Sequence, residues 1–338
     1  MKILLIGGTG NISTACVRLA VSRGHDVTLL TRGNRKRDPS IDGKVSVIQA
    51  DINDVAQVAE ILADLTFDVI ANFIILKPSQ MQRDLDLFKG KCGQYIFISS
   101  ASVYQKPLSS PIVTEGTPLA NPYWDYSREK IACEELCIKA YRESGFPITI
   151  IRPSLTYDTV IPVAIGSWDD FTIVDRIRKD KPVIVHGDGT SLWTVTHSDD
   201  FAKGFVGLCG NQQAMGEAFH ITSDELLTWD QIYDAVGAAA GTPVIKVHIP
   251  SEFISKIVPW QEGNLLGDKS ASAIFDNSKL KRAVPDFKAT IPFKVGITRT
   301  IKWFEADPSR MKIVDYANQM MDHILDRYNS VFDTLKPM

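Results

Sequence analysis

Short apolar runs in the first half of the chain alternate with longer amphipathic stretches, and this alternation limits the folds available to it. The runs are residues 2–7, 26–31, 45–51, 67–74, 95–100 and 148–153, and helices are expected between them, near 12–24, 53–64, 79–90 and 123–144. Strands that are apolar throughout are buried on both faces, which is typical of parallel sheets covered by helices. The pattern predicts an α/β protein with a doubly wound parallel sheet, whose ligands bind at the carboxyl ends of the strands.

A glycine-rich turn follows the first apolar run directly, in the segment "KILLIGGTGNIS". Between a buried strand and a helix, such a turn lets the backbone approach a pyrophosphate and points free N–H groups at it. The predicted contacts to a dinucleotide are Gly7, Thr9, Gly10, Asn11 and Ile12. Ser13 stands where the last glycine of such a turn usually lies, and serine is small enough to keep the helix close to the strand.

The second strand ends in "LLTRGNRKR", so Thr31 takes the place of the acid that bonds the ribose 2′-hydroxyl of NAD. Arg32 follows it, and a guanidinium favours a 2′-phosphate. We therefore expect NADP or NAD as cofactor, with NADP preferred. Residues 35–37 add positive charge nearby, which a solvated basic loop would also explain.

Tyr126 and Lys130 are four residues apart in an expected helix, so both side chains lie on one face. A nearby ammonium stabilises a phenolate and makes a tyrosine usable as an acid or base. Ser100 ends the strand "YIFISS" at the edge where ligands should bind, and its hydroxyl could hold a substrate oxygen. These three residues are the predicted catalytic set.

The motifs "GGTGNIS", "YIFISSASVY", "YSREK", "IRPS" and "HSDDFAKGF" occur in the order found in extended short-chain dehydrogenases/reductases. The chain most resembles their NAD-dependent epimerase/dehydratase branch, and is also similar to the chloroplast stem-loop RNA-binding proteins within it. The resemblance implies a Rossmann-like fold with a smaller C-terminal α/β substrate domain. It also implies that Ser100 polarises the substrate oxygen, that Tyr126 is the acid/base, and that Lys130 binds the nicotinamide ribose and lowers the tyrosine pKa.

The same resemblance implies that Asp51 and Ile52 lie by the adenine and that Pro153 lies near the nicotinamide. Two plainer interpretations stay open: Asp51 as a helix cap and Pro153 as a strand terminator. His197 matches a position that usually serves structure. No histidine pair has convincing metal-ligand spacing, so we expect no metal.

The chain departs from the family where substrate is bound. Ser100 is followed by Ala101 and Ser102 in place of the two acids of sugar-nucleotide 4,6-dehydratases, which argues against dehydration. The positions that bind a nucleotide diphosphate in the epimerases align with Leu155, Trp193 and Leu265 or Leu266. We therefore expect a smaller or less anionic substrate than a UDP-sugar, contacted by Ser100, Ser102, Tyr126 and Trp193. A tryptophan buried in the core is an equal alternative for Trp193.

Domain boundaries are less sharp, because we find no linker or repeat. We expect an NAD(P)-binding domain over residues 1–156, joined again by 191–225, and a substrate domain from 157–190 and 226–306. Residues 307–338 are expected to form a helix that begins at Asp307-Pro308. That helix either lies on its own domain or makes a subunit contact.

Composition excludes several classes. The net charge is −3, which gives no broad attraction to nucleic acid or anionic lipid. No run of 18 apolar residues occurs, and the five cysteines lack a C-x-x-C pair. We expect a cytoplasmic protein with a small-molecule substrate, no nucleic acid and no membrane partner, which could form a homodimer.

Together these features predict an NAD(P)-dependent oxidoreductase or epimerase. It would transfer a hydride at a secondary alcohol or ketone of a sugar-like or polyol substrate. One alternative is a UDP-sugar 4-epimerase. The other is a non-enzymatic RNA-binding or cofactor-sensing protein that has kept the fold.

Overall fold

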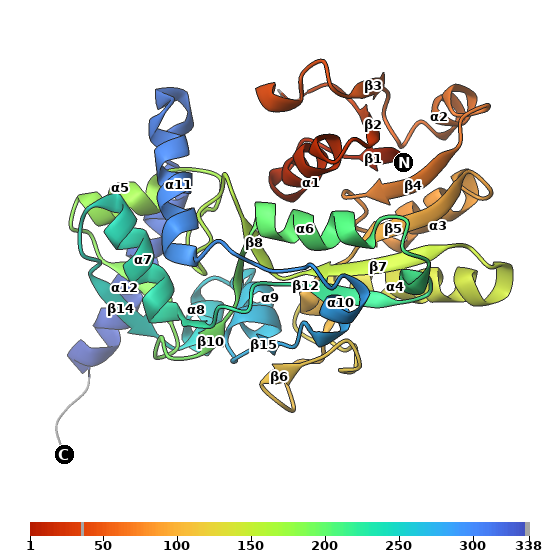
Figure 1. Ribbon diagram of the computed structural model, residues 1–338. Coiled ribbons are helices and arrows are strands. Elements are labelled where there is room, and N and C mark those ends of the chain that lie inside the picture. The colour runs from red at the N-terminus through yellow and green to blue at the C-terminus, as the bar shows by residue number, and fades with distance from the viewer. Residues whose placement is uncertain (35–36, 335–338) are drawn as a thin grey trace.

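Seven strands pair in parallel to form the central sheet (Figure 1). The computed structural model describes residues 1–34 and 37–334. The sheet order is β12-β7-β5-β4-β1-β2-β3. The strands are β1 (Lys2–Ile6), β2 (Asp26–Thr31), β3 (Ser46–Gln49), β4 (Phe67–Asn72), β5 (Cys92–Ile98), β7 (Ile148–Pro153) and β12 (Ala218–Ile221). The predicted doubly wound parallel sheet is confirmed.

Helices cover both faces of this sheet, as the sequence pattern requires. On one face lie α1 (Asn11–Ser22) and α6 (Ser198–Leu208), and on the other lie α2 (Val55–Ile61), α3 (Pro78–Leu87) and α4 (Asp125–Ser144). Alternate residues of one strand serve the two cores: Ile3 and Leu5 pack with α1, whereas Leu4 and Ile6 pack on the side of α2 and α3. Burial on both sides explains why these strands are apolar throughout.

The direction of winding reverses between β1 and β4. From β1 the chain continues outward through β2 and β3, then returns to place β4 on the other side of β1. The loops that follow β1 and β4 therefore separate at the carboxyl edge and leave a crevice, which is where open α/β sheets bind ligands. The glycine turn is the loop after β1.

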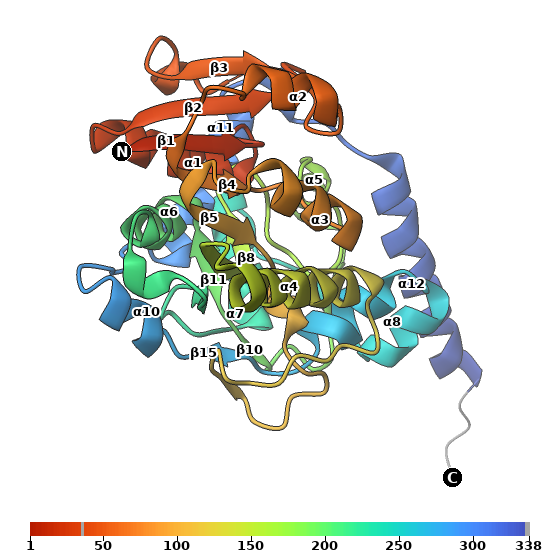
Figure 2. The same ribbon diagram turned by 90° about the vertical axis from the view of Figure 1, so that its right-hand side faces the viewer.

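A second lobe packs beside the carboxyl edge (Figure 1) and lies behind the sheet in the view of Figure 2. Its strands form short pairs: β8 (Leu155–Tyr157) with β11 (Val195–His197), β9 (Val183–His186) with β14 (Lys246–Ile249), β10 (Leu192–Trp193) with β13 (Leu227–Thr228), and β6 (Ile112–Val113) with β15 (Ile274–Phe275). Its helices are α5 (Thr172–Arg178), α7 (Trp229–Ala240), α8 (Ser251–Ile257), α9 (Gln261–Asn264), α11 (Phe293–Glu305) and α12 (Asp315–Thr334). The short helix α10 (Ser278–Ala283) packs instead in the core that α1 and α6 form on the central sheet. A π-helical turn over Leu265–Lys269 follows α9.

The predicted segment 191–225 supplies β10 and β11 to the second lobe, and α6 and β12 to the central sheet and its cover. The boundaries of the two domains remain a prediction. Among the described residues, no helix combines the length and the apolar composition needed to cross a membrane.

The C-terminal helix begins later than predicted. Asp307 caps only a 3₁₀ turn over Pro308–Arg310, and α12 starts at Asp315. Residues between them are held by other bonds: Phe171 N–H donates to the Lys312 carbonyl at 2.8 Å, and Val314 N–H donates to Thr172 Oγ1 at 2.8 Å. These contacts with the start of α5 keep the segment out of the helix.

Candidate active site

The turn after β1 needs glycine for two separate reasons. Gly7 has a φ of +82°, and a Cβ there would lie 2.5 Å from Ile74 Cγ2. A Cβ on Gly8 would lie 2.7 Å from Leu29 Cδ2 on β2. The turn is therefore pressed between the loop after β4 and the second strand, and it delivers the chain into the N-terminus of α1.

Ser13 does more than fit in place of a glycine. Its hydroxyl donates to the Gly7 carbonyl at 2.7 Å and accepts from Gly10 N–H at 2.9 Å. One side chain thus ties both ends of the turn to the first turn of α1. The serine stabilises the loop that the sequence pattern assigned to the pyrophosphate.

A cavity of about 630 Å³ opens at this edge. It is lined by nine of the predicted cofactor residues: Gly7, Thr9, Gly10, Asn11, Ile12, Thr31, Arg32, Asp51 and Ile52. The remaining lining residues were not predicted as cofactor contacts: Ile6, Ser13, Leu30, Asn34, Ala50, Asn53, Phe73, Ile74, Ile98, Ser154, Thr156, Val160 and Trp168. Several of these follow or end a strand, which is the signal that could have found them.

The residues predicted to determine the preference for NADP over NAD lie together along the cavity. Thr31 ends β2, and Arg32 and Asn34 follow it along the cavity. Residues 35 and 36 of the predicted basic loop lie outside the described residues, and Arg37 pairs with Asp42 at 3.3 Å.

Asp51 follows β3 along the same cavity. Its Oδ1 accepts from the backbone N–H and the side-chain amide of Asn53, both at 3.0 Å. The cap of α2 is Asp54, which accepts from Gln57 N–H at 3.1 Å. The helix-cap alternative for Asp51 therefore does not hold, and Asp51 lines the cavity.

Lys130 is anchored at the carboxyl ends of two central strands. Its Nζ donates to the Ile75 carbonyl at 2.6 Å and to the Ile98 carbonyl at 2.9 Å, in the loop after β4 and at the end of β5. The side chain is 3% exposed, and burial lowers its pKa to about 8. Nζ lies 5.7 Å from the centre of the Tyr126 ring. The predicted one-turn spacing on α4 thus brings the two groups together.

Tyr126 is half-buried one turn before Lys130, and its environment keeps the phenol protonated. Burial raises the pKa of Tyr126, the Ser100 hydroxyl lowers it, and the Asp268 carboxylate raises it again. The net direction is upward, which favours the protonated phenol. Asp268 belongs to the π-helical turn of the second lobe and was not among the predicted site residues.

The remaining predicted residues lie at different depths. Ser100 follows β5 and caps the 3₁₀ turn over Ala101–Val103. Ser102 is buried, with its hydroxyl 2.9 Å from Ser100 Oγ. Pro153 ends β7, and its neighbour Ser154 lines the cavity in its place. Trp193 is 1% exposed and packs on Trp229 in the core of the second lobe, so its predicted contact with substrate stays a prediction.

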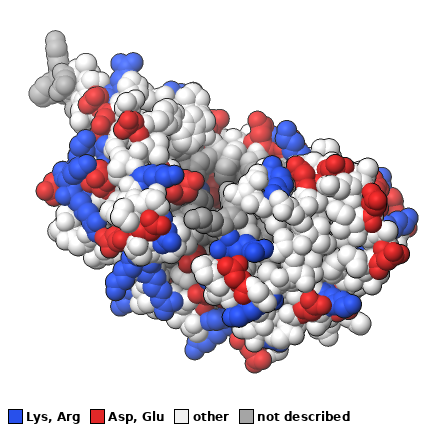
Figure 3. All heavy atoms as spheres, turned by 90° about the horizontal axis from the view of Figure 1, so that it is seen from above, with Lys and Arg blue, Asp and Glu red and all other residues white. Residues whose placement is uncertain are grey.

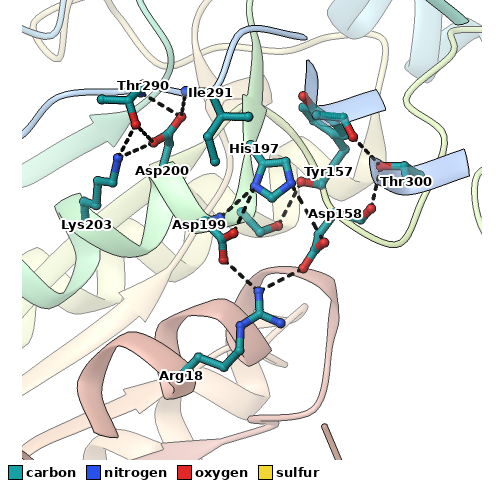
Figure 4. A network of polar contacts seen from close by, with 12 residues as sticks. Arg18, Tyr157, Asp158, His197, Asp199, Asp200, Lys203, Thr290, Ile291 and Thr300 are labelled. Atoms are coloured by element: carbon teal, nitrogen blue, oxygen red, sulfur yellow. Dashed lines mark hydrogen bonds and ion pairs between the residues drawn. The ribbon is translucent and has the colours of Figure 1, made fainter. Parts of the chain in front are cut away.

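Arg18 joins the cofactor side of the molecule to the second lobe (Figure 4). From α1 its guanidinium reaches Asp38 at 2.8 Å, Asp199 at the start of α6 at 2.7 Å, and Asp158 after β8 at 3.2 Å. His197 lies between the last two carboxylates (Figure 4), at 3.9 Å from Asp158 and 3.6 Å from Asp199. Because Thr156 and Val160 line the cavity, this network holds one of its walls.

Asn11 fixes the same wall from the glycine turn. Its amide nitrogen donates to the Thr156 carbonyl at 3.0 Å, and its oxygen accepts from Thr159 N–H at 3.3 Å. The predicted dinucleotide loop and the segment after β8 are therefore a single hydrogen-bonded unit.

Comparison with known proteins gives a family. Residues 3–222 match the model of the NAD dependent epimerase/dehydratase family. The chain is 28% identical over 265 residues to the chloroplast stem-loop binding protein of 41 kDa b from Arabidopsis thaliana, covering 75% of this chain and 67% of that protein. It is 23% identical over 291 residues to 2'-dehydrokanamycin reductase from Streptomyces kanamyceticus, covering 85% and 80%.

Among solved structures, UDP-glucose 4-epimerase from Bifidobacterium longum in complex with NAD+ and UDP matches with a TM-score of 0.73. The identity is 20%, and the match covers 92% of this chain and all of that one, which shows a common fold. The family match is the stronger finding, because it spans well over half of the sequence and includes the glycine turn, Ser100, Tyr126 and Lys130. The chain belongs to the NAD dependent epimerase/dehydratase family of extended short-chain dehydrogenase/reductase enzymes.

Proposed function

We propose that this protein is a nicotinamide-dependent oxidoreductase or epimerase that acts on a secondary alcohol or ketone of a sugar-like or polyol substrate. One observation carries the proposal. The buried Lys130 ammonium is anchored to carbonyls of Ile75 and Ile98 beside the glycine-turn cavity, with Tyr126 one helical turn away. Such an anchored pair suits proton transfer next to a cofactor.

In the proposed reaction, Tyr126, Ser100 and Lys130 have different roles. Tyr126 holds the proton that moves to or from the substrate oxygen, and Ser100 donates a hydrogen bond to the same oxygen. Lys130 orients the site and carries positive charge when protonated. Bound nicotinamide supplies the hydride acceptor or donor. Because the phenol of Tyr126 has a raised pKa, the resting chain is set to give a proton, as reduction of a ketone requires.

NADP is the preferred cofactor of this proposal. The glycine turn and the N-terminus of α1 would hold the pyrophosphate, and Asp51 and Ile52 would lie by the adenine. Thr31 places no carboxylate at the end of β2, and Arg32 is exposed there to meet a 2′-phosphate.

Three apolar side chains of the second lobe support the proposed class of substrate. Leu155, Trp193 and Leu265 are all buried in its core, at the positions that align with diphosphate contacts of the epimerases. Apolar side chains cannot replace guanidinium donors to a diphosphate. This supports a sugar-like or polyol substrate over a UDP-sugar, although several solved relatives are UDP-sugar epimerases.

One assay separates the candidate reactions. The protein loaded with NADP+ is mixed with a panel of sugars and polyols, with UDP-glucose included, and nicotinamide absorbance is followed. We expect reduced cofactor to accumulate with a non-nucleotide member of the panel. A transient signal that returns to baseline indicates an epimerase, and calorimetric binding of UDP with turnover of UDP-glucose would support the 4-epimerase alternative instead.

One relative is named as a stem-loop binding protein, so RNA binding without catalysis is the non-enzymatic alternative. Among the described residues on the face seen in Figure 3, Lys and Arg side chains are interspersed with Asp and Glu and form no continuous basic surface. The net charge is −3. Both observations favour the enzymatic proposal, because RNA binding depends on clustered positive charge.

A further inference from the structure

Two serines beneath the catalytic Ser100 form a hydroxyl chain that runs from α4 to the end of β5. Ser102 lies on the 3₁₀ turn after β5, and Ser127 is the residue after Tyr126 on α4. Their exposed fractions are 3% and 0%. Ser127 Oγ donates to Ser102 Oγ at 2.8 Å, and Ser102 Oγ lies 2.9 Å from Ser100 Oγ.

Counting hydrogens gives this chain a direction. A hydroxyl has one hydrogen to donate and two lone pairs that accept. Ser127 uses its hydrogen on Ser102. Either oxygen of the Ser100–Ser102 contact could donate, and donation by Ser102 is the arrangement that leaves its buried hydroxyl hydrogen paired. Ser100 Oγ also accepts from Ser102 N–H at 3.2 Å. With both lone pairs engaged, the hydrogen of Ser100 points outward.

From this geometry we propose that Ser102 and Ser127 are positioning residues that hold Ser100 as a hydrogen-bond donor to the substrate oxygen. The inference rests on the proposed function and deepens it. A ketone or alkoxide oxygen only accepts hydrogen bonds, so a hydroxyl already oriented as a donor stabilises the charge that develops there without reorganising. Ser102 thereby acts through Ser100, and the direct substrate contact predicted from the sequence is not needed.

The turn that carries Ser102 is itself clamped. The side-chain amide of Asn121 donates to the Ser102 carbonyl at 2.8 Å and to the Gly267 carbonyl at 2.7 Å. Gly267 lies on the π-helical turn that also carries Asp268. The clamp prevents the Ser102 backbone from drifting away from Ser100, so the hydroxyl distances are set by both lobes.

The test measures the pKa of Tyr126, which depends on the orientation of the neighbouring Ser100 hydroxyl. The groups that face Tyr126 are Ser100, Asp268, Lys130 and the Trp124 ring, whose centre lies 5.0 Å from that of Tyr126. A Ser100 that donates to the phenolate lowers the pKa of Tyr126. The protein is labelled with [¹³Cζ]tyrosine and loaded with NADP+, the Tyr126 resonance is assigned with Tyr126→Phe, and its pKa is followed by NMR.

We expect Ser102→Ala and Ser127→Ala each to raise the pKa of Tyr126 by about half a unit or more. Neither change should alter it further in a Ser100→Ala background, because both act through Ser100. Ser127→Thr keeps the hydroxyl and should keep the pKa of the unaltered protein. Ser144→Ala, which removes an exposed hydroxyl near the end of α4, is the matched control and should have no effect.

Equal shifts with and without Ser100, or no shift while Ser100 is present, would overturn the proposal. If one alanine variant fails to fold, the other carries the same comparison. Because the measurement needs no turnover, failure of this inference can be distinguished from failure of the proposed function. That function fails if Tyr126→Phe keeps full activity, whatever the NMR titration gives.

Discussion

At the scale of single residues, two backbone carbonyls hold the Lys130 ammonium, and Tyr126 lies beside it because the two residues are one turn apart on α4. The carbonyls of Ile75 and Ile98 that bind Lys130 come from other strands and leave no local sequence signal. Ser127 was missed for the same reason, since its partner Ser102 is 25 residues away.

Thr31 provides a test of cofactor choice at this scale. Replacing it by aspartate places a carboxylate at the end of β2, where it repels a 2′-phosphate and can bond a 2′-hydroxyl. We expect Thr31→Asp to weaken NADP+ relative to NAD+ by roughly tenfold or more. Calorimetric titration of both cofactors measures this, with Thr31→Ser as the control, and an unchanged ratio of dissociation constants would refute the assignment.

Ser13 carries a second prediction for a single side chain. Ser13→Ala leaves the Gly7 carbonyl and the Gly10 N–H without their partner and should cost about 1–3 kcal/mol of unfolding free energy. The dissociation constant for the cofactor should rise as well, because the turn loosens. Ser22→Ala at the exposed end of α1 is the control. Urea unfolding and cofactor titration that cannot distinguish the two variants would contradict this role.

At the scale of elements, the apolar pattern of the sequence was sufficient to predict the strands of the central sheet. It was insufficient to predict those of the second lobe. All seven sheet strands are parallel, and those of the first half were foreseen as continuous apolar runs. The second lobe uses pairs of two to four residues, such as β10 with β13, which are too short to show a period. The start of α12 was misplaced because contacts with α5, distant in sequence, hold residues 311–314.

The Arg18 network gives the prediction that belongs to elements. Arg18→Met removes the cation between Asp38, Asp158 and Asp199 while keeping much of the side-chain volume. Since the remaining carboxylates then repel one another, we expect a loss of about 1–3 kcal/mol in unfolding free energy and weaker cofactor binding. Arg37→Met breaks an exposed pair and should cost at most about 1 kcal/mol. If urea unfolding gives equal losses of unfolding free energy for Arg18→Met and Arg37→Met, the Arg18 network does not stabilise the fold beyond an exposed ion pair.

At the scale of the whole molecule, stability should depend on pH through Lys130. Burial lowers its pKa to about 8 in the folded chain, against 10.5 for an ordinary lysine. Between these values the unfolded chain binds a proton that the folded chain has released, so the free energy of unfolding rises with pH. Relative to Lys130→Met, the protein should gain about 2–3 kcal/mol across that interval.

Urea unfolding of both proteins at several pH values measures this gain. Other titrating groups, including the buried Lys106, are common to both chains and cancel in the difference. A difference that does not change with pH would mean that Lys130 keeps an ordinary pKa in the folded state.

The central claim is that Tyr126 transfers a proton while a nicotinamide exchanges hydride with a sugar-like substrate. The most direct measurement is the single-turnover rate of nicotinamide reduction in the unaltered protein and in Tyr126→Phe, each loaded with NADP+ and mixed with the sugar and polyol panel. We predict a rate about 100-fold or more lower in the variant, with cofactor affinity unchanged within about threefold. Equal rates in the two proteins, or no reduction with any member of the panel, would contradict the account.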